Sequence, residues 1–477
     1  MEKNFTTGSV LKGIIFFSLP YLLSYFLQTL YGMADLFIIG QFADVSATTA
    51  VSIGSQFMHF LTVIVVGLAM GSTVSIGQAV GKNDKKSISA NIGNTITLFM
   101  VLSLILTTVL LLLVNPIVSI MSTPSEAVSG TVDYLTICFI GIPFITAYNI
   151  ISSIFRGMGD SKTPMYFIAI ACIINIGLDY LFMGAFQMGP SGAALGTVLS
   201  QACSVLISLI IILKRKNNMA VKKEDFKPKQ SVMKKILNVG IPIALQDGFI
   251  QISFLIITVI ANSRGLNDAA AVGIVEKIIS FLFLVPSSML STVSALGAQN
   301  IGAGKPERAK QTLRYATIIT VCFGLMVAIV MQFFAEPVVA LFTDVTTANG
   351  AKTIRLGEQY LRGYVWDCVF AGIHFSFSGY FCACGKSMLS FIHNILAILL
   401  VRIPGVYMTS LFFPETLFPM GLATAAGSLL SAIICVIFFK TILNHNISAT
   451  SKNLKKDITK HSFLCLCDIP IFMDRFF

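Results

Sequence analysis

Residues 72–81 read STVSIGQAVG, and residues 291–302 read STVSALGAQNIG. Both segments carry the same Ser-Thr-Val-Ser run, and in both a Gln and then a Gly follow it. Two further pairs keep nearly the same separation along the chain, because Pro20 matches Pro242 and Gly159 matches Gly385. Recurrence at a fixed spacing indicates an internal repeat, so we expect two related halves.

The composition places these halves in a membrane. Hydrophobic residues make up 55% of the 477 residues and charged residues only 12%, with a mean hydropathy of +0.83. Soluble domains carry about 25% charged residues. Twelve membrane helices would need roughly 264 apolar positions, which nearly exhausts the apolar residues of this chain. This arithmetic excludes a cytosolic enzyme, a secreted disulfide scaffold and a disordered tail protein. An outer-membrane barrel would give a lower mean hydropathy, because its strands alternate.

Apolar runs bounded by charges or by Gly and Pro predict twelve helices, six in each half. Because six is an even number, both halves start from the same side of the membrane, and their repeat is parallel. We therefore predict an all-α polytopic membrane protein with 12 transmembrane helices in two six-helix bundles. The predicted spans are 14–39, 47–79, 90–114, 131–155, 163–183, 191–213, 236–260, 269–298, 312–334, 358–382, 387–411 and 419–443.

The basic residues predict the orientation. Most of the 33 Lys and Arg residues lie at the termini, in the central linker and in the loops that follow even-numbered helices. The alternate loops hold only Arg264, Lys352 and Arg355. By the positive-inside rule both termini should be cytoplasmic in the cell membrane. The predicted domains are an N-terminal lobe 1–213, a basic cytoplasmic linker 214–235, a C-terminal lobe 236–445 and a cytoplasmic tail 446–477.

Acidic residues inside predicted spans indicate a functional or structural role, because inserting each one at mid-bilayer costs about 2.5–3.5 kcal/mol of free energy. In the first half, Asp35, Asn175, Asp179 and Thr197 fall at similar depths on three different helices. Two carboxyl groups held together cannot both ionise cheaply, so one would bind a proton near neutral pH. The same oxygens could hold a sodium ion instead. The alternative is that both aspartates are solvated at the outer interface.

A second group of candidates lies in the C-terminal lobe. Glu276 and Asp367 lie within predicted helices eight and ten, and His374 shares a helix face with Asp367. The alternative for Glu276 is local charge compensation by the lysine that follows it. We expect Asp247 and Arg402 to lie near the cytoplasmic interface, where a long side chain can reach water.

Two residues of the first helix point to motion and to a cavity. Pro20 removes a backbone hydrogen bond inside the helix and favours a kink, so it could act as a hinge that the charge state of Asp35 biases. Simple tolerance of proline is the alternative. Gln28 lies two turns below Asp35 and would line a cavity, or it would hydrogen-bond a neighbouring helix. The ten cysteines show no zinc-type spacing and are interpreted as packing thiols, so no metal beyond a possible Na⁺ and no cofactor is expected.

With these motifs in view, the chain resembles the multidrug and toxic compound extrusion (MATE) transporters over roughly residues 8–445. The resemblance depends on the two-bundle layout and three segments: Met33–Gly40 (MADLFIIG), Gln78–Gly81 and Arg156–Pro164 (RGMGDSKTP). It implies export of small cationic lipophilic molecules by antiport against protons or sodium ions, by a monomer in contact with membrane lipid, without nucleic acid or enzymatic activity.

In the branch of the family that this chain resembles, the coupling site lies in the N-terminal lobe. The resemblance assigns this role to Asp35, Asn175, Asp179 and Thr197. It also implies that Gln28 and Asn149 line the drug cavity and that Pro20 kinks the first helix.

Two departures limit the resemblance. A sodium-linked branch carries a Glu on helix seven, where this chain has Ile250 and Gln251, and Asp367 only approaches that branch's acidic position on helix ten. The tail beyond Lys452 matches nothing in the family. Three rival functions remain: a lipid-linked oligosaccharide flippase of the same superfamily, a channel and a membrane-embedded enzyme. The flippase would want buried basic residues, the channel a filter motif, and the enzyme a catalytic pair or metal ligands.

Overall fold

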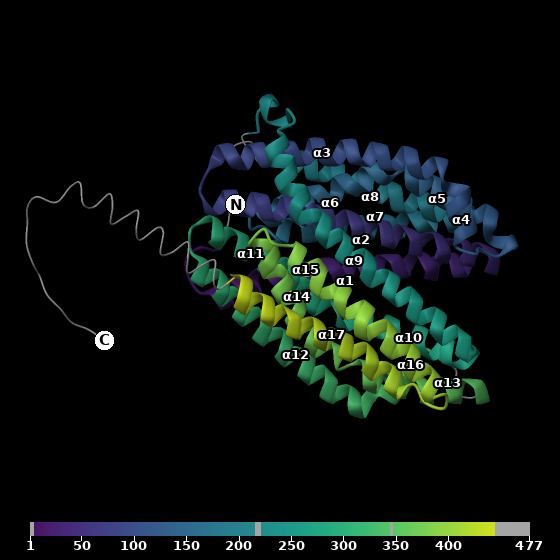
Figure 1. Cartoon of the computed structure of the whole chain (residues 1–477). Helices are drawn as coiled ribbons and strands as arrows, with labels where there is room; N and C mark the ends of the chain where they lie inside the picture. The colour runs from purple at the N-terminus through teal and green to yellow at the C-terminus, as the bar shows by residue number, and fades with distance from the viewer. Residues whose placement is uncertain (1–3, 215–220, 344–346, 444–477) are drawn as a thin grey trace, which may run out of the picture.

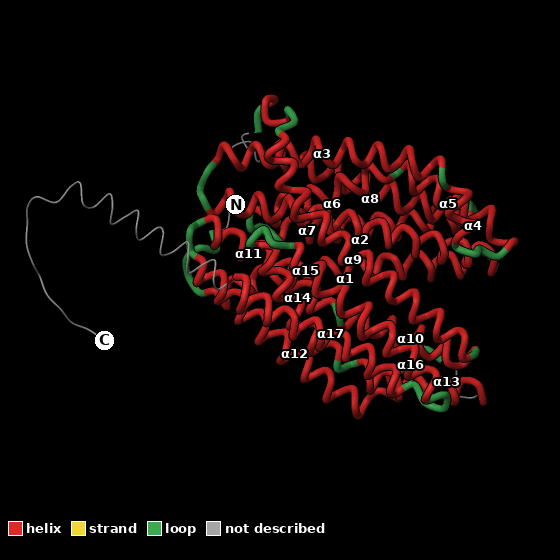
Figure 2. Tube along the Cα trace, in the orientation of Figure 1, coloured by secondary structure: helices red, strands yellow, loops and turns green. Residues whose placement is uncertain are grey.

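Helices form nearly all of the computed structural model, which describes residues 4–214, 221–343 and 347–443. Within these ranges there is no β-strand, and short loops join the helices (Figure 2). Ten of the described helices are long and apolar enough to cross a membrane. The count is eleven if Ser125–Ile140 and Ile142–Gly157, which meet at a bend of 50°, form one span.

Figure 1 shows the helices as two bundles that lie side by side. Each predicted span corresponds to one long helix or to consecutive shorter ones, so the predicted fold class is confirmed. The first bundle contains α1 (Val10–Phe42), α2 (Val45–Gly81), α3 (Lys85–Leu112) with α4 (Val114–Ile120), α5 (Val128–Ile140) with α6 (Ile142–Gly157), α7 (Lys162–Asp179) continued by a wide turn (Tyr180–Ala185), and α8 (Gly189–Lys214).

The second bundle repeats this order. It contains α9 (Gln230–Arg264), α10 (Leu266–Leu282) with α11 (Leu284–Gly302), α12 (Pro306–Ala340), α13 (Ala348–Tyr364) with α14 (Asp367–Ala383), α15 (Met388–Ala397) continued by a wide turn (Ile398–Arg402) into α16 (Ile403–Phe412), and α17 (Phe418–Phe438) with a last wide turn (Phe439–Leu443). The pair α13–α14 is not among the helices counted above, because each has only 17 residues and α13 carries the charged residues Lys352, Arg355, Glu358 and Arg362.

The contacts between the bundles are themselves repeated. Gln78 donates a hydrogen bond to the backbone oxygen of Ala383 at 2.8 Å, and Gln299 donates one to the backbone oxygen of Gly157 at 3.3 Å. A Cβ atom on Gly81 would meet the backbone of Gln299, and one on Gly302 would meet the backbone of Gln78. The repeated glutamine–glycine segments therefore form one symmetric crossing, at which only glycine lets the backbones approach.

The linker is partly ordered against the first bundle. Its turn Lys223–Phe226 packs on α3, where Asn94 donates to the backbone oxygen of Asp225 at 3.0 Å and accepts from the backbone N–H of Lys229 at 2.6 Å. Helix α9 begins at Gln230, six residues before the predicted start, because its backbone hydrogen bonds continue into polar sequence. The predicted tail, 446–477, lies outside the described residues.

Helix α1 belongs to both bundles. Val10, Ile14 and Phe17 lie in an apolar cluster with residues of α11, α12 and α14, whereas Ile38 and Ile39 pack within the first bundle. Pro20 lies between these two contacts, inside a helix that is continuous from Val10 to Phe42. A bend at this position would move the outer part of α1 relative to the second bundle.

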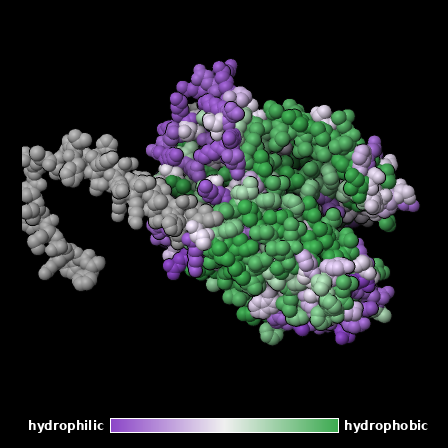
Figure 3. All heavy atoms as spheres, in the orientation of Figure 1, coloured by the Kyte–Doolittle hydropathy of each residue, from purple (hydrophilic) through white to green (hydrophobic). Residues whose placement is uncertain are grey.

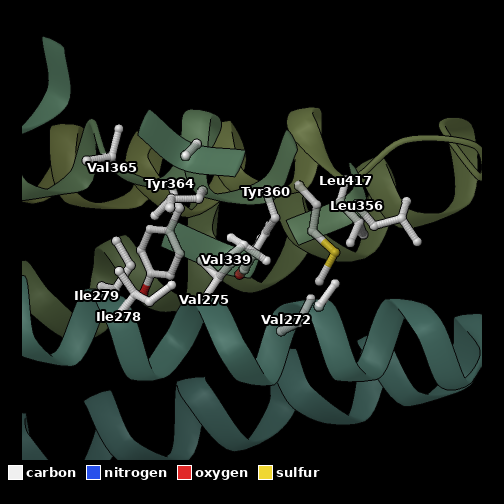
Figure 4. Packing of buried hydrophobic residues seen from close by; sticks show 14 of the residues in the cluster. Val272, Val275, Ile278, Ile279, Val339, Leu356, Tyr360, Tyr364, Val365 and Leu417 are labelled. Atoms are coloured by element: carbon white, nitrogen blue, oxygen red, sulfur yellow. The ribbon is translucent and has the colours of Figure 1, made fainter. Parts of the chain in front are cut away.

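The surface agrees with burial in a bilayer. On the face drawn in Figure 3, apolar residues cover the middle of both bundles. Hydrophilic residues gather most densely at the end where the linker and the N-terminus lie, which we call the basic end. The second bundle has its own apolar core, in which Val272, Val275 and Tyr360 pack between α10 and α13 (Figure 4).

Candidate cation site

Four oxygen-bearing side chains of the first bundle meet at the end opposite to the basic end. Asp35 lies seven residues, roughly 10 Å, before the end of α1. Its side chain is 3% exposed, and its Oδ2 accepts a hydrogen bond from Thr197 of α8 at 3.3 Å. Helix α8 starts at Gly189, so Thr197 lies roughly 12 Å from that start and matches the depth of Asp35.

Helix α7 supplies the other two side chains. Asn175 and Asp179 are one turn apart and fully buried, and Asn175 donates to Oδ1 of Asp179 at 3.4 Å. Asp35 also interacts directly with both Asn175 and Asp179, although α1 and α7 are far apart in sequence. The structure therefore brings together all four residues that the depth argument selected. The alternative, in which the aspartates are solvated at the interface, does not fit their burial.

The cluster has an excess of acceptors. Oδ1 of Asp35, Oδ2 of Asp179 and Oδ1 of Asn175 are buried without a hydrogen-bond donor. Among the described residues, no Lys or Arg lies within ion-pairing distance of either carboxyl group. Two buried carboxylates in contact repel each other and lose their hydration, so the pair needs a cation. A proton or a monovalent metal ion supplies it, and the all-oxygen donor set suits either.

Two neighbours complete the cluster and were missed from the sequence. Tyr31 lies one turn before Asp35 on α1, and its hydroxyl is close enough to Asp35 and Thr197 to interact with them electrostatically. A Cβ atom on Gly196 would collide with Oδ1 of Asp179, so the glycine leaves the space that this carboxyl group occupies. The i, i+4 spacing from Asp35 could have indicated Tyr31, whereas the contact of Gly196 depends on how α7 and α8 pack.

The C-terminal lobe assembles a different cluster. Glu276 accepts from Thr258 at 3.3 Å, and Asp367 lies 3.6 Å from Nη2 of Arg402, which also donates to the hydroxyl of Tyr364 at 2.8 Å. This cluster carries its own cation. Arg402 ends the wide turn of α15, and the N-terminal lobe has a corresponding wide turn directly after Asp179. Near this wide turn, the C-terminal lobe therefore has the guanidinium of Arg402, whereas the N-terminal lobe has a second carboxyl group, that of Asp179.

Two expectations about charged residues are wrong. Arg402 is 6% exposed and lies over the ring of Phe254 at 5.0 Å, and it does not reach water at an interface. Asp247 lies 17 residues into α9, roughly 26 Å along its axis from the basic end. Both residues are too far from the basic end of their helices for a side chain to reach water there.

His374 joins a different group from the one predicted. Its ring lies 5.8 Å from the ring of His393 on α15, which exchanges hydrogen bonds with Ser378 and Ser431 at 2.9 and 2.7 Å. No group of three or more His, Cys, Asp or Glu side chains in the described ranges is arranged to hold a metal ion.

A narrow polar pocket, partly open to solvent, lies between α1 and α6, toward the basic end. Gln28 and Asn149, the two predicted cavity residues, both line it. Five hydroxyl side chains and Arg156 line it as well, and only Val66 and Pro164 are apolar. We call it the tyrosine pocket, because Tyr21, Tyr25 and Tyr148 contribute their hydroxyl groups.

A two-bundle repeat with buried carboxyl groups at one end and a polar pocket toward the other is typical of membrane transporters. The MatE family model matches residues 20–181 and 242–408, one stretch in each lobe, so the chain belongs to the MatE family.

Three similar proteins illustrate this membership. The probable multidrug resistance protein YpnP of Bacillus subtilis (strain 168) is 29% identical over 92% of this chain and 96% of its own length. An FAD transporter of Shewanella oneidensis is 24% identical over 81% of this chain and 85% of its own length. The solved structure of a multidrug resistance MATE family transporter in an outward-facing conformation has a TM-score of 0.85 and 23% identity, covering 94% of this chain and 98% of that one. The structural likeness supports the fold.

Proposed function

We propose that this protein is a secondary antiporter of the cell membrane that exports small lipophilic compounds, cationic ones included, in exchange for protons or sodium ions. The family membership and the name of the Bacillus subtilis relative support multidrug efflux. The coupling ion binds among Asp35, Asn175, Asp179 and Thr197. The basic end faces the cytoplasm, as the positive-inside rule requires, and the cation site then faces outward.

One observation carries this proposal: the carboxyl groups of Asp35 and Asp179 come from separate helices and meet in a buried site that has no basic residue among the described residues. Binding a cation there joins α1 to α7. Because α1 also packs on the second bundle below Pro20, a change at Asp35 can bias the position of α1 between the lobes. A single ion can thus favour one state of a two-state helix, which antiport requires.

The C-terminal lobe is the weaker candidate for coupling. Arg402 already neutralises part of the charge of Asp367 and Glu276, so this cluster needs an external ion less. This comparison favours the N-terminal lobe for coupling. Arg402 is engaged by Asp367 and Tyr364, so the C-terminal lobe offers no free guanidinium at this cluster for the pyrophosphate of a lipid-linked oligosaccharide.

The test is dye transport into inverted vesicles, whose lumen corresponds to the outside of the cell. The vesicles contain wild-type protein or Asp35→Asn, and a proton gradient and, separately, a sodium gradient are imposed. We expect one gradient to drive efflux in the wild type and neither to do so in Asp35→Asn. Asp44→Asn is the matched control, because Asp44 is an exposed carboxylate that only caps the start of α2. Full gradient-driven efflux by Asp35→Asn would refute the assignment.

A further inference from the structure

The tyrosine pocket contains an unpaired positive charge. Arg156 lines the pocket, and its guanidinium lies 4.8 Å from the centre of the Tyr21 ring. No residue in the described ranges accepts a hydrogen bond from it or forms an ion pair with it. A second, smaller pocket shares Tyr21, Val66 and Arg156 with the first, so Arg156 lines both.

The hydroxyl groups of the pocket are oriented toward the same space. Ser291 of the second bundle donates to the hydroxyl of Tyr21 at 2.9 Å, and Tyr21 donates to the hydroxyl of Tyr25 at 3.1 Å. Because the hydroxyl of Tyr25 accepts from Tyr21, its own proton remains available to donate. The pocket thus offers a planar guanidinium fork and a phenol donor.

The charges around the pocket favour an anion. None of the residues that line it is acidic. The nearest carboxylate on the facing bundle, Asp247 of α9, lies close enough to act on Tyr25, and it accepts from Gln246 at 3.3 Å. A guanidinium without a carboxylate partner in a half-buried site gains most from a bidentate oxyanion, whose geometry matches its fork.

We propose that the tyrosine pocket is a subsite for an oxyanion, a carboxylate or a phosphate, on an amphiphilic cargo molecule, held by Arg156 and Tyr25. This inference rests on the proposed function and narrows its substrate class. The cargo that fits best is a zwitterion, with its oxyanion at Arg156 and its cation toward Asp247. A lipid phosphate has the same chemistry and would compete for the same subsite.

Removing the guanidinium of Arg156 should greatly weaken the binding of a cargo molecule that carries an oxyanion. Charge-assisted hydrogen bonds contribute about 1.5–3 kcal/mol, which corresponds to a ten- to hundredfold change in affinity. Arg156→Gln should therefore raise the KM for a cargo with a carboxylate about ten- to hundredfold. It should leave the KM for the same cargo without the carboxylate unchanged. Arg156→Lys keeps the charge and loses the fork, so its effect should be intermediate.

The experiment measures transport by the full chain in phosphatidylcholine liposomes. The two substrates are a fluoroquinolone with a piperazinium and a carboxylate, and its ethyl ester, which keeps only the cation. Lys162→Gln is the matched control, because Lys162 is an exposed cation at the same end of the molecule and does not line the pocket. Tyr25→Phe serves as a second variant, because it removes only a hydroxyl group and should lower affinity for the acid alone.

The subsite is supported if Arg156→Gln raises the KM for the acid and not for the ester, and if Lys162→Gln changes neither. The proposal is overturned if Arg156→Gln raises the KM for acid and ester equally, or for neither. Adding phosphatidylglycerol to the liposomes distinguishes the source of the oxyanion: if this lipid raises the KM of the ester in the wild type but not in Arg156→Gln, a lipid phosphate occupies the subsite. If the wild type transports neither compound under any gradient, the proposed function fails. If the wild-type protein transports the ester, and Arg156→Gln has the same KM as the wild type for both acid and ester, only the oxyanion subsite is refuted.

Discussion

Substitution of Gly196 by alanine should uncouple transport without unfolding the protein. Gly196 lies on α8 directly before Thr197, and a Cβ atom there would overlap Oδ1 of Asp179. The overlapped atom is the far end of a side chain, so Asp179 moves and the helices do not. Alanine also has a higher helix propensity than glycine, by up to about 1 kcal/mol, which favours the fold.

The displacement follows from van der Waals contact. Non-bonded heavy atoms need roughly 3.5 Å, so the carboxyl group must retreat by more than about 1 Å. Asn175 is already 3.4 Å from Oδ1 of Asp179, at the long limit of a hydrogen bond, so this shift breaks the contact. A misplacement of this size in a preorganised site can cost about a hundredfold. We expect a loss of that order in affinity for the coupling ion.

The assay is the initial rate of dye transport into inverted vesicles as a function of the driving ion's concentration. Gly196→Ala should shift the half-saturating ion concentration upward by one to two orders of magnitude, with protein levels unchanged in the membrane. Gly177→Ala is the matched control: it lies on α7 between Asn175 and Asp179, and a Cβ atom there meets nothing within 4 Å. An unshifted ion dependence in Gly196→Ala, or an equal shift in Gly177→Ala, would refute the reasoning.

Four further outcomes are expected. Arg402→Met should lower the free energy of unfolding by about 3–5 kcal/mol, because it leaves the carboxyl group of Asp367 uncompensated; thermal melting in detergent measures this, and a melting point like that of the wild type contradicts it. Glu276→Gln should keep ion-coupled efflux, and its loss would show that the second lobe takes part in coupling. Gly81→Ala should reduce folded protein in size-exclusion chromatography, because the added methyl meets backbone atoms that cannot retreat, and a normal elution profile would count against the symmetric crossing. Pro20→Ala should slow efflux if the bend of α1 is part of transport, whereas unchanged rates would remove the hinge from the mechanism.

The helical membrane fold was predictable from the sequence because its causes are local. Burial of about twenty consecutive apolar residues in a bilayer depends on composition along the chain, and it does not depend on partners. The Gln78 and Gln299 segments showed the repeat, and the structure places them in one symmetric crossing. The apolar run 358–382 predicted the span α13–α14, but it missed most of α13, whose first turns carry Lys352 and Arg355.

Helix depth was enough to select Asp35, Asn175, Asp179 and Thr197, because rise per residue and topology give each one a level in the membrane. Depth does not say which helix faces point at each other. The contact between Asp35 and Thr197 joins residues 162 positions apart, and packing of α1 against α7 and α8 creates it.

Tertiary structure alone decided the partners of the remaining charges. Arg402 was expected at an interface, yet it is buried beside Asp367, and His374 turned away from Asp367 toward His393. Arg156 is a motif residue whose lack of a partner shows only when the surrounding helices are in place. Hydropathy determines where a segment lies in the membrane, whereas the neutralisation of a buried charge depends on side chains that other helices bring to it.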